Sequence, residues 1–196
     1  MGKEMRNEID LDCFLVAKDL VFMMGEYDRY GRLCARIIKG KKSHLVNRTC
    51  VQILNDSLNC IGYDLKGAIK GARSILGNRN MCPVMVNPYQ IICLFPIKSP
   101  QKEDCIWFNP DHIVKTKAYG NKTLIELSNN QSILVDSKLY SFNNKLQIAN
   151  QLKQISSQRG NQPTSMNLHL TRKKGHQFSK DKTGRYNFNE LDEKIA

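Results

Sequence analysis

The sequence lacks the patterns that define most membrane, secreted and metal-binding proteins. It has no run of about eighteen apolar residues, and the start MGKEMRNEIDLDCF has no basic-then-apolar layout, so we expect neither a membrane span nor a secretory signal. Its seven cysteines form no CxxC pair, and its four histidines form no HExxH motif. We therefore expect no disulfide framework and no metal site, and we expect reduced, buried thiols in a cytosolic protein.

Motifs for catalysis and nucleotide binding are also missing. Gly67 and Gly71 lie inside a helical period, where small residues permit close packing, and no Walker or dinucleotide-binding motif is present. The carboxylates form no paired cluster suited to acid/base chemistry. We expect no enzyme, no catalytic residue and no cofactor.

What the sequence does have is an excess of positive charge on a chain apolar enough to fold. Lys and Arg number 30 against 18 Asp and Glu, which leaves a net charge of +12. Such a surface attracts nucleic acid, anionic membranes or acidic proteins, and nucleic acid is the commonest of these partners. With 41% apolar residues among 196, the chain is large enough for one well-packed domain and a tail.

The stretch from Ser57 to Gly77 combines an apolar face and a cationic face in one helical period. Apolar residues recur at spacings of three and four, which predicts a helix capped near residues 55–57 and ended by Gly77. At about 100° per residue, three cations fall within an arc of roughly 60°, and two polar residues project close to them. The candidate DNA-binding residues here are Asn59, Tyr63, Lys66, Lys70 and Arg73. A solvated face of a structural helix is the alternative interpretation.

Most of the remaining chain has the character of antiparallel strands. Apolar runs and turn residues predict strands at residues 13–17, 20–24, 33–39, twice within 81–97, at 105–108 and three times within 112–135. Residues 45–54 are ambiguous between helix and strand; we predict a helix, which would form a helix-turn-helix-like pair with the next one. Lys115 and Lys117 share one strand face and are further candidates for DNA contact, although a solvated sheet face is the alternative.

A second amphipathic helix is predicted over residues 141–155, where it would pack on the preceding strands or pair with a second copy of itself. From Ser156 the composition becomes polar and basic, which indicates a flexible basic tail over residues 157–196. The predicted fold class is therefore α+β. It consists of a mixed, mainly antiparallel β-sheet with a basic, glycine-containing helix and a helix after the strand meander.

Four separated blocks of the sequence are specific enough to suggest a family. They are VNRTC, GYDLKGAIKGARSIL, PVMVNPYQIICLFPI, and CIWFNPDHIV followed by LSNNQSILVDSKLYSF. Their order and spacing resemble the ComK family of competence transcription factors over about residues 27–154. The resemblance implies a DNA-binding domain over residues 9–156, adds Arg48 as a candidate DNA-binding residue and supports Lys66. Asn47 stands where the family commonly has Asp, a departure that fits a divergent second copy.

The resemblance implies a bacterial activator of DNA-uptake genes, cytoplasmic and nucleoid-associated. Such a protein binds double-stranded DNA at AT-rich promoter boxes as an oligomer, largely through the minor groove, and helps RNA polymerase engage. Narrow A·T minor grooves concentrate negative potential and attract Lys and Arg. Adaptor-mediated proteolysis is associated in the family with an aromatic-Leu-Tyr-Pro segment, which the residues after Gln158 do not match. The alternative function is a regulatory interaction protein with only nonspecific nucleic-acid affinity.

Overall fold

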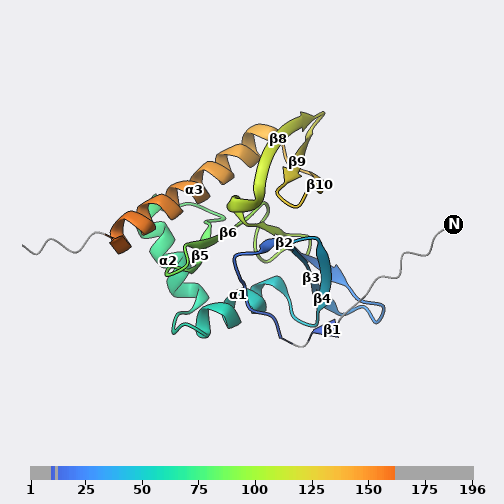
Figure 1. The fold of residues 1–196 in the computed structure, drawn as a ribbon, viewed down its shortest axis with the longest axis horizontal. Helices are drawn as coiled ribbons and strands as arrows, with labels where there is room; N and C mark the ends of the chain where they lie inside the picture. Colours follow the sequence, from blue (N-terminus) through green and yellow to red (C-terminus); the bar gives the residue numbers. More distant parts are fainter. Residues whose placement is uncertain (1–9, 12, 162–196) are drawn as a thin grey trace, which may run out of the picture. The chain divides into compact units, whose positions relative to one another are not determined.

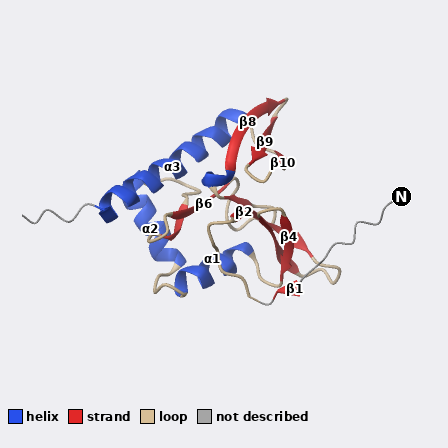
Figure 2. Ribbon diagram, in the orientation of Figure 1, coloured by secondary structure: helices blue, strands red, loops and turns tan. Residues whose placement is uncertain are grey.

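Two β-sheets and three α-helices make up the part of the chain that the computed structural model describes, residues 10–11 and 13–161 (Figures 1 and 2). The larger sheet has the strand order β1-β4-β3-β2-β7-β6-β5, and the smaller has the order β10-β9-β8. Neighbouring strands pair antiparallel except β1 and β4, which are parallel. The predicted α+β class with mainly antiparallel sheets is confirmed.

The elements have the following bounds. The strands are β1 (Asp10–Leu11), β2 (Leu20–Tyr27), β3 (Leu33–Lys39), β4 (Lys42–Val46), β5 (Val84–Asn87), β6 (Ile92–Pro96), β7 (Ile106–Phe108), β8 (Ile113–Tyr119), β9 (Lys122–Leu127) and β10 (Ser132–Val135). The helices are α1 (Cys50–Asn59), α2 (Leu65–Leu76) and α3 (Leu139–Asn161).

The strand predicted at residues 13–17 is absent, whereas those at 20–24 and 33–39 are confirmed as parts of β2 and β3. Residues 13–17 instead lie against α1, because the backbone N–H of Val16 donates to Ser57 Oγ at 2.9 Å. A side chain thus satisfies a backbone donor that a neighbouring strand would otherwise pair.

A cluster of four phenylalanines joins the larger sheet to α3. Phe108 of β7 lies 5.5 Å from Phe22 of β2 and 6.0 Å from Phe95 of β6, measured between ring centroids. Phe142 of α3 packs edge-on against Phe95 and Phe108 at 5.7 and 5.6 Å. Such tilted and edge-on contacts are the favoured geometries for aromatic pairs. The same core includes residues of α2 and of the smaller sheet: Ala72, Leu76, Ile125, Leu127 and Val135.

The single helix predicted from Ser57 to Gly77 is wrong. Ser57 belongs to α1, the chain turns through residues 60–64, and α2 begins only at Leu65. Gly62 has a φ of +81° at this turn, and the Asp64 side chain caps α2, so neither residue continues a helix. Gly77 does end α2 with a positive φ of 84°.

The helix predicted for residues 45–54 is confirmed only in its second half. Leu45 and Val46 end strand β4, and α1 begins at Cys50. The start is set by a capping box in which Thr49 Oγ1 accepts from the Gln52 N–H at 3.2 Å and Gln52 Oε1 accepts from the Thr49 N–H at 2.8 Å.

The predicted three-strand meander is confirmed as β8, β9 and β10. Helix α3 follows it and packs against β6, β8 and α2. It begins at Leu139 and ends at Asn161, so Ser141 lies inside the helix and is not its cap, and residues 157–161 are helical. The rest of the predicted tail lies outside the described residues.

The cysteines are free, as predicted, but two of them are exposed. Cys13 and Cys60 lie at the surface, whereas the other five are buried. Burial raises the pKa of Cys50 and of Cys93 to about 12, so both remain neutral thiols near pH 8.

Thiol labelling therefore separates the two classes. With a chromogenic disulfide reagent at pH 8, we expect Cys13 and Cys60 to react rapidly and the five buried thiols to react only after unfolding in urea. Rapid reaction of more than two thiols in the native protein would contradict this assignment.

Gly25 allows the loop between β6 and β7 to lie on β2. A Cβ at this position would come within 1.9 Å of the Glu103 carbonyl oxygen. We expect Gly25→Ala to lower the free energy of unfolding in urea by about 1–3 kcal/mol or more. Gly71→Ala is the control, because its Cβ would meet nothing within 4 Å and alanine should stabilise α2 by up to about 1 kcal/mol. Equal stabilities of the two variants would contradict the close approach.

Candidate nucleic-acid interface

Helix α2 is held in place by its cap and by its apolar face. Asp64 Oδ1 accepts a hydrogen bond from the Gly67 N–H at 2.6 Å, which satisfies a backbone donor in the first turn. Ala72 and Leu76 are buried, and the helix packs on β5 and α3 (Figure 1). The opposite side of α2 is therefore left exposed.

Three cations occupy this exposed side. Lys66, Lys70 and Arg73 are all exposed, and none forms an ion pair with another residue in the described part of the chain. Beside them, Gly67, Gly71 and Ser74 are exposed and have little or no side chain. At 100° per residue they continue the exposed arc next to the cations. We call these six residues the α2 face. It combines positive charge with small residues that let a ligand come close to the helix.

The surroundings of the α2 face carry few negative charges. No Asp or Glu occurs in the sequence between Asp64 and Glu103, and α3 contains none between Leu139 and Asn161. Of the elements that pack on α2, β5 and α3 therefore add no repulsion toward a polyanion, whereas α1 carries one carboxylate, that of Asp56. Sequence periodicity missed this property, although an acid-free stretch of this length is visible in the sequence.

Arg79 is a further cation near α2 that helical spacing did not reveal. It follows the helix, and its Nε donates to the Leu76 carbonyl oxygen at 3.1 Å. This contact places a positive charge at the C-terminal end of α2, where it satisfies a free carbonyl and opposes the helix dipole.

Two predicted site residues lie off α2. Asn59 is the last residue of α1 and is exposed, and Tyr63 lies in the turn before α2. Their predicted place on one helix with Lys66 is wrong, because the chain turns at Gly62. Tyr63 nevertheless immediately precedes the cap residue Asp64 and is 45% exposed, so it lies at the N-terminal end of α2.

Arg48 precedes α1, whereas the three cations belong to α2. It is exposed in the turn between β4 and α1, where its N–H donates to the Val46 carbonyl oxygen at 2.7 Å. The full length of α1 separates it from the turn that leads to α2, about 15 Å for ten residues at 1.5 Å each.

Lys115 and Lys117 lie on β8 of the smaller sheet. Both are exposed, but Lys117 Nζ pairs with Glu126 Oε1 of β9 at 2.5 Å, and Lys115 is the register partner of Glu126. The Lys117 ammonium holds the pKa of Glu126 below its usual range, so this carboxylate is charged at neutral pH. The smaller sheet packs beside the first half of α3, whereas α2 packs beside the second half (Figure 1). These lysines therefore form a separate and less positive region.

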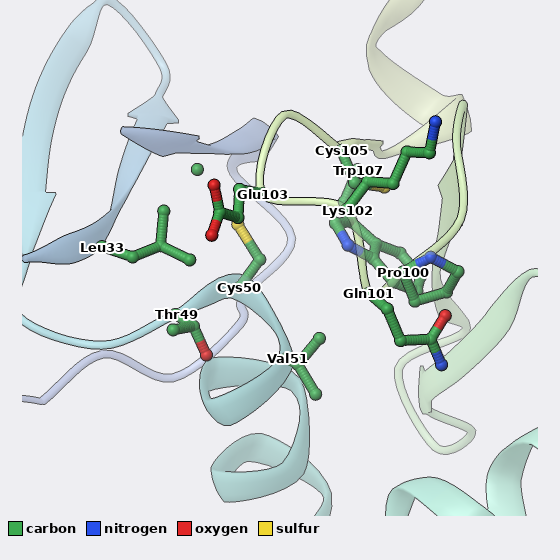
Figure 3. Close-up of a pocket in the computed structure, with 11 residues that line it drawn as sticks. Leu33, Thr49, Cys50, Val51, Pro100, Gln101, Lys102, Glu103, Cys105 and Trp107 are labelled. Carbon is green, nitrogen blue, oxygen red and sulfur yellow. The ribbon is translucent and has the colours of Figure 1, made fainter. Parts of the chain in front are cut away.

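A cavity of about 160 Å³ lies between α1 and the loop that precedes β7 (Figure 3). Its lining includes Cys50, Cys105 and Trp107. Burial raises the pKa of both thiols, which makes them poor nucleophiles. Among the described residues, no group of three or more His, Cys, Asp or Glu side chains could hold a metal ion.

An α+β domain with an acid-poor, cationic helix face belongs to the class of proteins whose surface suits a polyanion such as nucleic acid. The chain belongs to the ComK protein family, whose model matches residues 11–161. It is 27% identical over 117 residues to the "Competence transcription factor" of Bacillus subtilis (strain 168). The match covers 59% of this chain and 61% of that relative's length. No solved structure matches the chain significantly.

The described residues contain no helix that is both long and apolar enough to cross a membrane.

The α2 cap provides a test of how the face is built. We expect Asp64→Ala to lower the free energy of unfolding by about 1 kcal/mol, because the Gly67 N–H loses its acceptor. Asp64→Ser, which retains a capping oxygen, should recover most of this loss in urea titrations followed by circular dichroism. If the Ala and Ser variants were equally stable, the cap would not support α2.

Proposed function

We propose that this protein is a DNA-binding transcription factor that activates competence genes, a regulator rather than an enzyme. It binds AT-rich promoter boxes as an oligomer, largely through the minor groove, and helps RNA polymerase engage. Its place of action is the bacterial cytoplasm, at the nucleoid. Membership of the ComK family and the name of the Bacillus subtilis relative support the competence role.

The observation that carries the proposal is the α2 face. Lys66, Lys70 and Arg73 project from one side of a packed helix, and β5 and α3, which pack on it, carry no carboxylate. A cation that neutralises a phosphate releases condensed counterions, which supplies affinity without sequence information. The adjoining Gly71, where a Cβ would meet nothing within 4 Å, leaves space for a DNA backbone to come close to the helix.

Selectivity for AT-rich boxes follows from groove shape. A·T tracts have a narrow minor groove with enhanced negative potential, and an inserted Lys or Arg gains more there than over mixed sequence. The exposed cations Lys66, Lys70 and Arg73 are the candidates for insertion. Arg48, Asn59, Tyr63, Lys115 and Lys117 are assigned to phosphate contacts outside the central groove.

Oligomerisation would place two α2 faces on paired boxes. Each copy presents a single short cationic helix, and linking two such modules raises the effective affinity without any new contact. The same arrangement would match a paired arrangement of boxes in the promoter.

The Lys66→Ala, Lys70→Ala double variant tests the proposal. We expect at least tenfold weaker binding to an AT-box duplex and a plot of log K against log[salt] that is shallower by about two, because two phosphate contacts are lost. The measurement is fluorescence anisotropy across a salt series, with circular dichroism to check the fold.

The matched control is the Lys41→Ala, Lys42→Ala double variant, which removes the same charge from the exposed turn residue Lys41 and from Lys42, the exposed first residue of β4. It should keep the wild-type salt dependence. If both double variants lost the same affinity and salt dependence, the α2 face would contribute only through the net charge of the protein and would not be a binding surface. Equal affinities of the native protein for an AT-box duplex and a scrambled duplex would instead favour a regulatory interaction protein with only nonspecific affinity.

A further inference from the structure

A cavity of about 260 Å³ lies between helix α3 and the loop of residues 77–83, which follows α2. Four polar side chains line it, two of them cationic: Arg79, Asn80, Asn144 and Lys145. The rest of the lining is apolar and includes Pro83 and Phe95, which are both buried. Helices α2 and α3 pack on each other, so the loop runs alongside α3 (Figure 1). The cavity is much larger than the roughly 30 Å³ of one water molecule and close to the lower limit of ligand pockets, about 300 Å³.

The loop that carries Arg79 has a defined conformation. Arg79 Nε donates to the Leu76 carbonyl oxygen at 3.1 Å, and the buried Cys82 Sγ donates to the Arg79 carbonyl oxygen at 3.2 Å. Between them, Met81 has a φ of +54°, which turns the chain sharply. These contacts fix the position of Arg79 in the lining of the cavity.

The Arg79 guanidinium has donors to spare. It carries five N–H groups, and only the Nε–H has an acceptor among the described residues. Its two terminal NH2 groups therefore remain for a ligand. Their planar arrangement matches two oxygens of one phosphate group.

Lys145 is a half-buried cation without a counterion. Its Nζ donates to the Ile97 carbonyl oxygen, and no carboxylate of the described residues forms an ion pair with it. Burial lowers the pKa of Lys145, as expected when an ammonium leaves water without a negative partner. An anion in the cavity would supply that partner and accept from the two remaining N–H groups.

The lining carries no negative charge that would oppose an anion. Its residues all belong to two parts of the chain that lack Asp and Glu, the stretch between Asp64 and Glu103 and helix α3. A phosphate uses the donors better than a carboxylate does. A carboxylate offers two oxygens, whereas a phosphate monoester offers three and carries about −1.5 to −2 charges at pH 7.

We propose that this cavity binds a phosphate ester, with the phosphate between Arg79 and Lys145 and its organic part against Pro83 and Phe95. The exposed amides of Asn80 and Asn144 donate to the remaining phosphate oxygens. The site goes beyond the proposed function, because a small phosphorylated ligand fills it without DNA. The sugar–phosphate backbone of DNA offers the same chemistry, so the two sources have to be separated by experiment.

Titration calorimetry of the full-length protein with adenosine monophosphate (AMP) tests the site. We expect AMP to bind about tenfold or more tightly than adenosine, because the charge-assisted hydrogen bonds go to the phosphate. The α2 face also attracts AMP by its charge, so variants of the cavity decide where AMP binds.

Lys145→Met removes the half-buried charge and should weaken AMP binding about tenfold or more. Arg79→Lys keeps the charge but lacks the planar fork, and it should weaken AMP binding about threefold or more. The matched control is Lys138→Met, which removes one exposed charge just before α3 and outside the cavity; it should bind AMP as the native protein does. Circular dichroism checks the fold of each variant.

The same variants identify the source of the phosphate. If the ligand is a DNA backbone, AMP should displace a duplex, and Lys145→Met should bind the duplex more weakly than Lys138→Met does. If the ligand is a free phosphate ester, these two variants should bind the duplex equally. Either result supports the site.

Equal affinities of the native protein for AMP and adenosine would overturn the site. AMP affinities of folded Lys145→Met and Arg79→Lys that match the affinity of Lys138→Met would overturn it as well. Neither outcome affects the proposed function, which the Lys66→Ala, Lys70→Ala variant tests with DNA.

Discussion

The packing of Phe142 against Phe95 and Phe108 is the contact on which the arrangement of the domain depends. These rings belong to α3, β6 and β7, so one cluster links the long helix to the middle of the larger sheet. The same core includes Ala72 and Leu76 of α2 and residues of β9 and β10. A single apolar cluster thus fixes both sheets and the cationic helix with respect to one another. The positions of the cations on α2 therefore depend on the packing of an uncharged core.

The turn between α1 and α2 determines which of the candidate DNA-binding residues lie on one helix. A continuous helix would have placed Asn59, Tyr63 and Lys66 in one row. The break at Gly62 instead starts a new helix, capped by Asp64, whose apolar side lies on β5 and α3. It also leaves Tyr63 in the loop that precedes the cap residue Asp64. The three cations share a face because that face is defined by α2 alone.

The sequence pattern predicted the elements whose structure is determined by residues close together in the chain. The β2–β3 hairpin, the meander of β8 to β10 and the three-cation face of α2 were all predictable from alternation, turn residues and helical spacing. The break after Asn59 was not, because Ile61 fits the apolar period and only the backbone geometry of Gly62 and the Asp64 cap interrupt it. The Lys117–Glu126 ion pair depends on the pairing of β8 with β9, which spacing along one segment does not encode.

The exposed glycines of α2 also affect how firmly the helix is formed. Gly67 and Gly71 each cost roughly 1 kcal/mol of helix stability relative to alanine, and at Gly71 a Cβ would meet nothing within 4 Å. Helix α2 is therefore maintained by its buried side and not by its own propensity. A ligand that binds α2 only when the helix is formed would stabilise the helix. Ligand binding to the α2 face and formation of the helix are then coupled equilibria. Amide hydrogen exchange within α2 would report on both.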